Sequence, residues 1–320
     1  MRQHPDGCMA EAVQWAHTKP RLFVQSDYCW MLHVVLVGSN MAALFVRERL
    51  PGVMGQATTL LTLAEDGSAQ IDSQLDLFTG ALDELIDAIC DLIAGGDAHL
   101  VVTPNVDQIL QLNRSPAARQ AVEAASLRLV DGMPLVGLLR LLGVRSVHRH
   151  TGADLLPMAA RLSREKAWSI ALVGGMEGVA EAAVQRLRAE HPGTMIEAVD
   201  LPMLTGPQDP AGKAAVLRLT ELQPSLVFLC MGFPRQESWF LHWRELLPGG
   251  VYLGTGAAVD FAAGTKRRAP KLVQNLGFEW VFRLWQEPRR LAHRYLVTGP
   301  RFVLVAAFSA KARLRAALRR

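Results

Sequence analysis

Polar side chains and glycines gather at points where apolar runs of this 320-residue sequence stop. In FLCMGFPRQESWF, residues 228–240, an apolar run ends at Gly232, and Arg235, Gln236 and Glu237 follow together. Such groups can hold or activate a ligand when they share one edge of a sheet. The pattern recurs along the chain and gives the candidates Thr103, Asn105, Asp131, Gly174, Gly175, Gln236 and Asp260.

Asp131 is the candidate for acid–base chemistry. In LVDGMP, residues 129–134, it follows an apolar run and precedes Gly132. A carboxylate at the mouth of an apolar crevice loses hydration, and the resulting rise in basicity suits it to take a proton from a sugar hydroxyl. The same two residues also fit an ordinary Asp-Gly turn. Both interpretations stay open on the sequence.

The other candidates carry similar alternatives. Asn105 in TPNVDQ is a good helix N-cap, which leaves Thr103 free to face a ligand. Gly174 and Gly175 in LVGGMEGVAEAA could let backbone amides cradle a phosphate at a helix N-terminus, or simply form a tight turn. Their spacing is not the full dinucleotide-binding fingerprint. Glu237 fits a helix-capping role better than ligand binding.

Short apolar runs alternate with helical patterns from residue 71 onward, and this predicts the elements that position these side chains. HLVVTP, LRLVDG, SIALVGG, SLVFLCMG and VYLGTG each precede a helical pattern. Strand, turn and helix repeating in this order predict an α/β, Rossmann-like parallel sheet with crossover helices. Ligands bind such sheets at the carboxyl ends of the strands, where all the candidates fall.

Composition narrows the class of protein. Apolar residues make up 50% of the chain, yet no stretch reads as ~20 uninterrupted apolar residues, so we expect no membrane-spanning helix. The four cysteines are scattered, and His148 and His150 lack further ligands nearby, so we expect a reducing compartment and no metal site. The chain also lacks an Asp-x-Asp pair for a diphosphate-bound cation.

Charge and periodicity divide the chain into three parts. Residues 1–70 form an extension of uncertain structure that we expect to be dispensable for chemistry, with Met31, Met41 and Met54 as alternative starts. Residues 71–265 form the Rossmann-like core. Residues 266–320 form a basic helical C-terminal appendage with fourteen Lys/Arg and two acids, a net charge of 14 − 2 = +12. Such a segment predicts an anionic partner, and the apolar run 302–308 suits a membrane interface.

Seven segments, in this order and spacing, closely resemble the WecG/TagA/CpsF glycosyltransferase family (glycosyltransferase family 26). They are VVTPNVDQILQLNRSP, LVDGMPLVGLLRLLG, RHTGADLL, ALVGGMEGVAEAA, MGFPRQESWF, YLGTGAAVDFAAGTKRRAP and LGFEWVFRLWQEPRRLAHRYL. The resemblance runs from about residue 71 to 296. It implies a GT-E-like fold and an inverting, metal-independent enzyme without a cofactor. Its donor would be a UDP-hexose of N-acetylmannosamine or glucose type, and its acceptor a polyprenyl-diphosphate-linked sugar.

The resemblance also implies roles for individual residues. Asp131 matches the proposed base, Thr103 and Asn105 a polar pair beside the sugar, and Gln236 and Asp260 further ligands of the sugar nucleotide. Arg235 stands where the family has lysine. The implied products are exopolysaccharide, antigen or teichoic-acid precursors, made on the cytoplasmic face of the inner (plasma) membrane by a peripheral protein. Without a metal, arginines must stabilise the UDP leaving group, and the candidates are Arg149, Arg283, Arg290 and Arg294.

Two other function classes compete with this interpretation. The glycine-rich turn suggests an NAD-dependent Rossmann oxidoreductase, which the imperfect fingerprint weakens. The basic tail suggests a nucleic-acid-binding α/β protein, but its aromatic and basic residues follow no known nucleic-acid-reading pattern, so we expect no nucleic-acid partner. The sequence leaves a homo-oligomer open.

Overall fold

The computed structural model describes residues 21–25, 28–37, 40–48 and 59–318, in two compact units, Met1–Ala57 and Thr58–Arg320. The first unit contains a three-stranded antiparallel sheet of β1 (Arg21–Gln25), β2 (Tyr28–Val37) and β3 (Asn40–Glu48). Of the alternative starts, Met31 lies in β2 and Met41 in β3, whereas Met54 falls outside the described residues.

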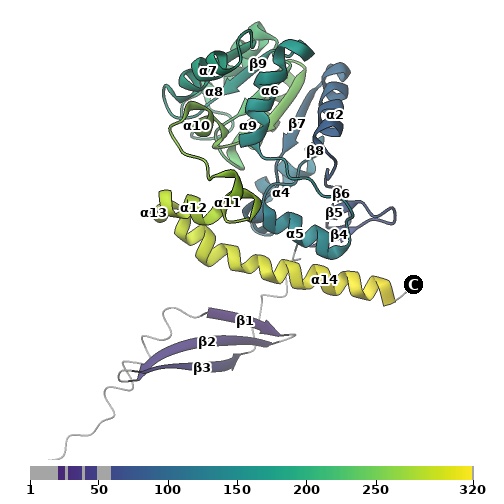
Figure 1. Cartoon of the computed structure of the whole chain (residues 1–320), viewed down its shortest axis with the longest axis vertical. Coiled ribbons are helices and arrows are strands. Elements are labelled where there is room, and N and C mark those ends of the chain that lie inside the picture. The colour runs from purple at the N-terminus through teal and green to yellow at the C-terminus, as the bar shows by residue number, and fades with distance from the viewer. Residues whose placement is uncertain (1–20, 26–27, 38–39, 49–58, 319–320) are drawn as a thin grey trace, which may run out of the picture. The chain divides into compact units, whose positions relative to one another are not determined.

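A six-stranded parallel sheet is the centre of the second unit, which confirms the Rossmann-like α/β prediction (Figure 1). Its order is β10-β9-β11-β12-β7-β8. The strands are β7 (Ala98–Val102), β8 (Leu127–Arg128), β9 (Ile170–Val173), β10 (Ile196–Val199), β11 (Leu226–Leu229) and β12 (Gly250–Gly254). The sequence analysis missed the edge strand β10. Its sequence IEAV is not a continuous apolar run, because the exposed Glu197 and the half-buried Ala198 lie between two buried residues.

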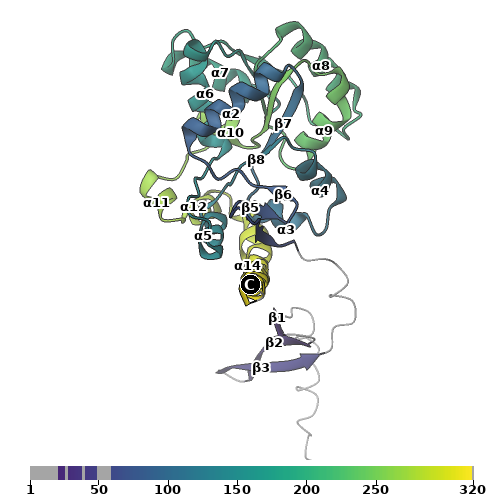
Figure 2. The same cartoon turned by 90° about the vertical axis from the view of Figure 1, so that its right-hand side faces the viewer.

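Helices cover both faces of this sheet because alternate side chains of each strand point to opposite faces. One face packs against α2 (Leu82–Gly95), α6 (Gly152–Lys166), α7 (Val179–Glu190) and α10 (Ala258–Ala263). The other packs against α3 (Val106–Gln111), α4 (Pro116–Glu123), α5 (Met133–Leu142), α8 (Pro210–Leu222) and α9 (Arg235–Trp243). Figure 2 shows the sheet between these two helical layers. The short 3-10 helix η2 (Arg244–Leu246) follows α9.

A second small sheet belongs to the same unit as the large one. It consists of β4 (Leu61–Leu63), β5 (Ala69–Ile71) and β6 (Leu75–Asp76), all antiparallel. Leu61, Ala69 and Ile71 are fully buried in the main core. The compact unit Thr58–Arg320 therefore includes this small sheet as well as the large one.

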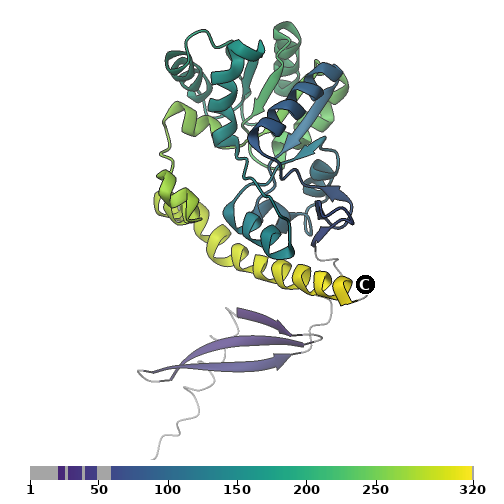
Figure 3. The same cartoon turned by 45° about the vertical axis from the view of Figure 1, so that its right-hand side comes forward.

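The basic appendage leaves the core after α10 and returns as an arm beneath the strand ends (Figure 3). It consists of α11 (Lys271–Asn275), α12 (Glu279–Gln286), α13 (Pro288–Ala292), η3 (His293–Thr298), η4 (Gly299–Arg301) and α14 (Phe302–Leu318). From Pro288 to Leu318 these segments follow one another without a break. None of the helices in the described part of the chain combines the length and apolarity needed to cross a bilayer.

The last helix, α14, packs against β4 and α5. Val305 and Ser309 are 1% exposed, and the Leu61 N–H donates to Ser309 Oγ over 2.9 Å. Helix α14 thus helps to bury the small sheet β4–β6.

We predict that a protein starting at Thr58 keeps the melting temperature of its compact unit, whereas one starting at Gln70 does not. The shorter protein loses β4 and with it the burial of Leu61, which alone stabilises by about 2 kcal/mol. Thermal melting of the two truncated proteins tests this. Equal melting temperatures would contradict the assignment of β4 to the core.

Candidate active site

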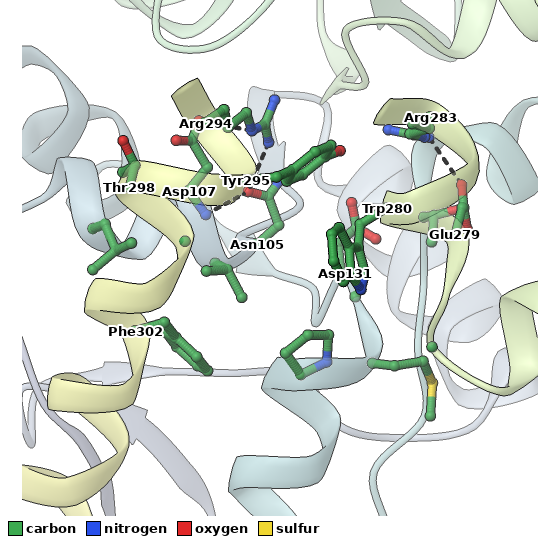
Figure 4. Close-up of a pocket in the computed structure, with 18 of the residues that line it drawn as sticks. Asn105, Asp107, Asp131, Glu279, Trp280, Arg283, Arg294, Tyr295, Thr298 and Phe302 are labelled. Atoms are coloured by element: carbon green, nitrogen blue, oxygen red, sulfur yellow. Dashed lines mark hydrogen bonds and ion pairs between the residues drawn. The ribbon is translucent and has the colours of Figure 1, made fainter. Parts of the chain in front are cut away.

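A cavity of about 280 Å³ opens at the carboxyl ends of β7 and β8 and is bounded on its far side by the appendage (Figure 4). Loops of the core supply one wall, and α12, η3 and α14 supply the other. The cavity brings together five of the predicted site residues, namely Asn105, Asp131, Arg149, Arg283 and Arg294.

Asp131 is held at the cavity by the turn that follows β8. Its N–H donates to the Pro104 carbonyl over 3.0 Å, which joins this turn to the one after β7. Gly132 then adopts a φ of +95°, a conformation that favours glycine, and α5 begins at Met133. The Asp-Gly turn is therefore present, and it places the carboxyl group at the cavity, so the two interpretations of this sequence are compatible.

Loss of hydration raises the pKa of Asp131 to about 6. The carboxyl group keeps some exposure to the cavity, but protein encloses its other sides. Positive charge on Arg283 and Arg149 opposes the rise, and negative charge on Glu279 adds to it. A pKa near 6 leaves Asp131 ionised at neutral pH and more basic than an ordinary aspartate, as a general base requires.

Asn105 both caps a helix and lines the cavity. Its Oδ1 accepts from the N–H groups of Asp107 (3.1 Å) and Gln108 (3.2 Å), so it caps α3 as predicted. The same oxygen accepts from Arg294 Nη2 over 3.4 Å. Thr103 lies deeper: it is 5% exposed, and its hydroxyl donates to the Gly254 carbonyl over 3.3 Å. Thr103 therefore joins the ends of β7 and β12 and does not line the cavity.

Arg149 ties the appendage to the core. Its guanidinium donates to Glu279 Oε2 and to Gln274 Oε1, each over 3.3 Å, and lies 3.7 Å from Asp154. A second arginine, Arg268, donates to Asp154 Oδ2 over 2.7 Å. These contacts hold the start of the appendage against α6.

Arg283 and Arg294 approach the cavity from the appendage. Arg283 lies 3.0 Å from Glu279 and above the Phe261 ring, 5.0 Å from its centroid. Arg294 lies 3.4 Å from Asp107. In the described part of the chain, neither Nε–H makes a hydrogen bond of good geometry, although Arg294 Nε is the atom that pairs with Asp107 Oδ2. Both side chains line the cavity and stay about one third exposed, so their guanidinium groups are available to an oxyanion there.

The remaining predicted residues lie outside this cavity. Gly174 and Gly175, at φ +81° and +104°, form the turn after β9, where an added Cβ would lie 3.0 Å from Met231 or 3.3 Å from Val259. Asp260 pairs with Lys266 at 3.2 Å. Arg290 is exposed and pairs with Glu287 on its own helical segment.

Gln236 and Glu237 also differ from expectation. Both side chains are 1% exposed, and α9 has no side-chain cap, so Glu237 does not cap its helix. The Gln236 Oε1 accepts from the N–H groups of Gly232 (3.0 Å) and Gly256 (3.2 Å), and its Nε2 donates to Glu237. The side-chain amide of Gln236 is thus hydrogen-bonded at both ends within the protein, and it does not reach the cavity.

The structure adds residues to the site that the sequence analysis did not single out. Trp280 and Tyr295 line the cavity with ring centroids 5.9 Å apart, and Figure 4 shows both reaching in from the appendage near Asp131. Glu279, Gln274 and Phe302 line it as well. The aromatic rings give this wall an apolar surface that suits the faces of sugar rings or a base. Their position in LGFEWVFRLWQEPRRLAHRYL was the available signal.

No group of three His, Cys, Asp or Glu side chains in the described residues is arranged to hold a metal ion. His150 is buried, with a ring nitrogen 2.8 Å from the Gly80 carbonyl, and it lies against Phe78. Burial lowers its pKa, so it stays neutral near pH 7. It serves packing.

The sequence of this chain was compared with models of known protein families. The model of the glycosyl transferase WecG/TagA/CpsF family matches residues 71–317, which include the sheet, the cavity and nearly all of the appendage. The chain belongs to this family. It is therefore a glycosyltransferase, an enzyme of polysaccharide or teichoic-acid biosynthesis.

The pH dependence of catalysis should report Asp131. A base is active when ionised, so kcat/KM should fall as the pH drops below about 6, and Asp131→Asn should lower turnover by about 10² to 10⁴ and remove this limb. Steady-state rates between pH 5 and 8.5 measure both effects. Near-normal turnover of the variant would remove Asp131 from the mechanism.

Stability supplies the matching control. The pKa of Asp131 is higher in the folded protein, at about 6, than its ordinary value of 3.8, so ionisation weakens the fold as the pH rises from about 4 to 6. Asp131→Asn removes this weakening. The variant should therefore melt no lower than the parent at pH 7.5, which separates lost chemistry from lost structure.

Proposed function

We propose that the protein transfers a hexose of N-acetylmannosamine or glucose type, with inversion and without a metal ion, from a UDP-sugar to a polyprenyl-diphosphate-linked sugar. The observation that carries the proposal is one cavity that is lined both by a carboxylate of raised pKa, Asp131, and by the guanidinium groups of Arg283 and Arg294. Base and leaving-group stabiliser are the two parts that a single displacement needs.

The reaction follows from this arrangement. Asp131 takes the proton of an acceptor hydroxyl, and the hydroxyl oxygen forms a bond to the anomeric carbon of the donor. The bond from that carbon to the β-phosphate oxygen breaks on the opposite face, and UDP leaves with the electron pair. Arg283 and Arg294 neutralise the charge that develops on the diphosphate. One displacement inverts the anomeric configuration.

The diphosphate has to compete with carboxylates already paired to these arginines. Glu279 contacts both Arg149 and Arg283, and Asp107 contacts Arg294. A diphosphate offers more charge and more acceptor oxygens than one carboxylate and can bridge two guanidinium groups, so it can replace these contacts. Trp280 and Tyr295 then face the sugars beside the base.

UDP binding tests the donor and the metal independence together. We expect UDP, but not NAD or single-stranded DNA, to raise the melting temperature in excess EDTA. Arg294→Gln should weaken UDP binding by about tenfold or more, the scale of one charge-assisted hydrogen bond, whereas the matched control Arg290→Gln, outside the cavity, should not. Calorimetric titration measures the affinities. Stabilisation by NAD alone, or a strict need for Mg²⁺ or Mn²⁺, would contradict the proposal.

The appendage is the proposed contact with the membrane that carries the acceptor. It exposes large apolar side chains beside basic residues, with Trp285 80%, Leu272 71% and Leu276 62% exposed. On α14, Phe302 and Val305 of the expected interfacial run are buried against the core, so only part of that run, with Val303, Leu304 and Phe308, is exposed. This supports α11 and α12 as the main interfacial segment, with arginines attracted to anionic headgroups.

Vesicle binding tests this surface without removing α14, which the core needs. The full-length protein should bind vesicles containing anionic lipid at low salt and be released by high salt. Replacing Leu276 and Trp285 by Ser should reduce binding, whereas the matched control Leu217→Ser, an exposed site on α8, should not. If the full-length protein does not bind anionic vesicles at low salt, the membrane role is ruled out.

A further inference from the structure

A buried pair of polar side chains, Gln236 and Glu237, lies behind the strand ends rather than in the cavity. Gln236 Nε2 donates to Glu237 Oε1 over 2.7 Å, and both residues are 1% exposed. In the part of the chain that the structure describes, Glu237 Oε2 has no hydrogen-bond partner. A carboxyl group that is buried and only half satisfied destabilises a fold, so its presence here needs a reason.

The pair controls two turns at the carboxyl edge of the sheet. An amide side chain has one acceptor end and one donor end. Because Glu237 accepts from the donor end of Gln236, the acceptor oxygen is directed to the N–H groups of Gly232 and Gly256. Gly232 follows β11 and Gly256 follows β12, so one oxygen links the turns after two neighbouring strands.

Gly254, the last residue of β12, shows how tightly the pair is enclosed. A Cβ at this position would lie 2.4 Å from Glu237 Oε1 and 2.7 Å from Gln236 Nε2, so only glycine leaves room for them. The carbonyl of Gly254 accepts from the hydroxyl of Thr103, which adjoins the cavity residue Asn105. A continuous set of contacts therefore runs from Glu237 to the end of β7.

We propose that Glu237 is a positioning residue: by accepting from Gln236, it orients that amide to hold the turns after β11 and β12, and through the contact between Gly254 and Thr103 it supports the turn after β7 that carries Asn105 to the sugar-nucleotide cavity. This inference rests on the proposed function for the identity of the ligand. Glu237 touches neither substrate nor the reacting atoms, and it acts through Gln236.

The protonation state of Glu237 is consistent with this role. Burial raises its pKa to about 7, so the group is about half neutral at pH 7 and largely neutral below it, and the neutral form still offers an acceptor oxygen to Gln236. A glutamine at position 237 would offer the same acceptor without a charge. A leucine would fill a similar volume and offer none.

The test compares Glu237→Leu, Glu237→Gln and the matched control Glu245→Leu, an exposed site on η2. Two measurements are made on the full chain: the Kd for UDP by calorimetry, and amide hydrogen exchange of the turns at residues 230–234 and 255–257 without ligand. Glu237→Leu should raise the Kd by about tenfold, the scale of one buried hydrogen bond, and speed exchange in both turns. Glu237→Gln and the control should stay within about twofold of the parent.

A second variant removes the other half of the pair. Gln236→Leu should have the same effects, and the double variant Gln236→Leu/Glu237→Leu should be no worse than either single one, because the two side chains act as a unit. The double variant also leaves no unsatisfied side-chain donor, so it reports the role even if Glu237→Leu fails to fold.

The outcomes separate the inference from the proposed function. Unchanged exchange and Kd in Glu237→Leu would overturn the positioning role, and so would a Glu237→Gln variant as impaired as Glu237→Leu, since that would mean that the acid itself is needed. If UDP does not bind the parent protein, the proposed donor is wrong, while the exchange data still decide whether Glu237 and Gln236 hold the turns.

Discussion

Charge balance around Asp131 is the constraint on which the site depends. Three carboxylates and three guanidinium groups interact with one another beside the cavity, and they are Asp131, Asp154 and Glu279 with Arg149, Arg268 and Arg283. Removing one partner from a group of partly buried charges leaves the others uncompensated, which is costly in a low-dielectric environment. Core and appendage each supply part of both signs. The appendage therefore has to dock for the core's charges to be neutralised, and the cavity forms as a result.

The parallel sheet and the strand-end location of the site were predictable because they depend on local patterns. Apolar runs followed by turn residues identified five of the six strands, and the rule that carboxyl ends share one edge placed Asn105 and Asp131 near each other. The missing strand β10 is not a continuous apolar run, and the strands of the small sheet β4–β6 are only two or three residues long. Their burial depends on residues far away in the chain, such as Ser309 for Leu61.

The roles of individual polar residues were less predictable, since position at a strand end does not say which way a side chain points. Gln236 follows its strand just as Asp131 does, yet two nearby backbone N–H groups occupy its oxygen. Arg290 and Arg294 are four residues apart in the same segment, but only Arg294 faces the cavity. The partners of Arg149 are separated from it by 125 and 130 residues, so no local pattern reveals them.

The contact between Leu61 and Ser309 spans 248 residues and bears on when the protein becomes active during its synthesis. On the same helical segment, Phe302 lines the cavity one turn before Val305 meets the core. A chain emerging from the ribosome can form the central strands early, as domains generally do during synthesis. It cannot close the cavity or cover β4 until α14 has left the exit tunnel. Until then the cavity lacks the wall that Phe302 supplies, and the core of the unit Thr58–Arg320 stays incomplete.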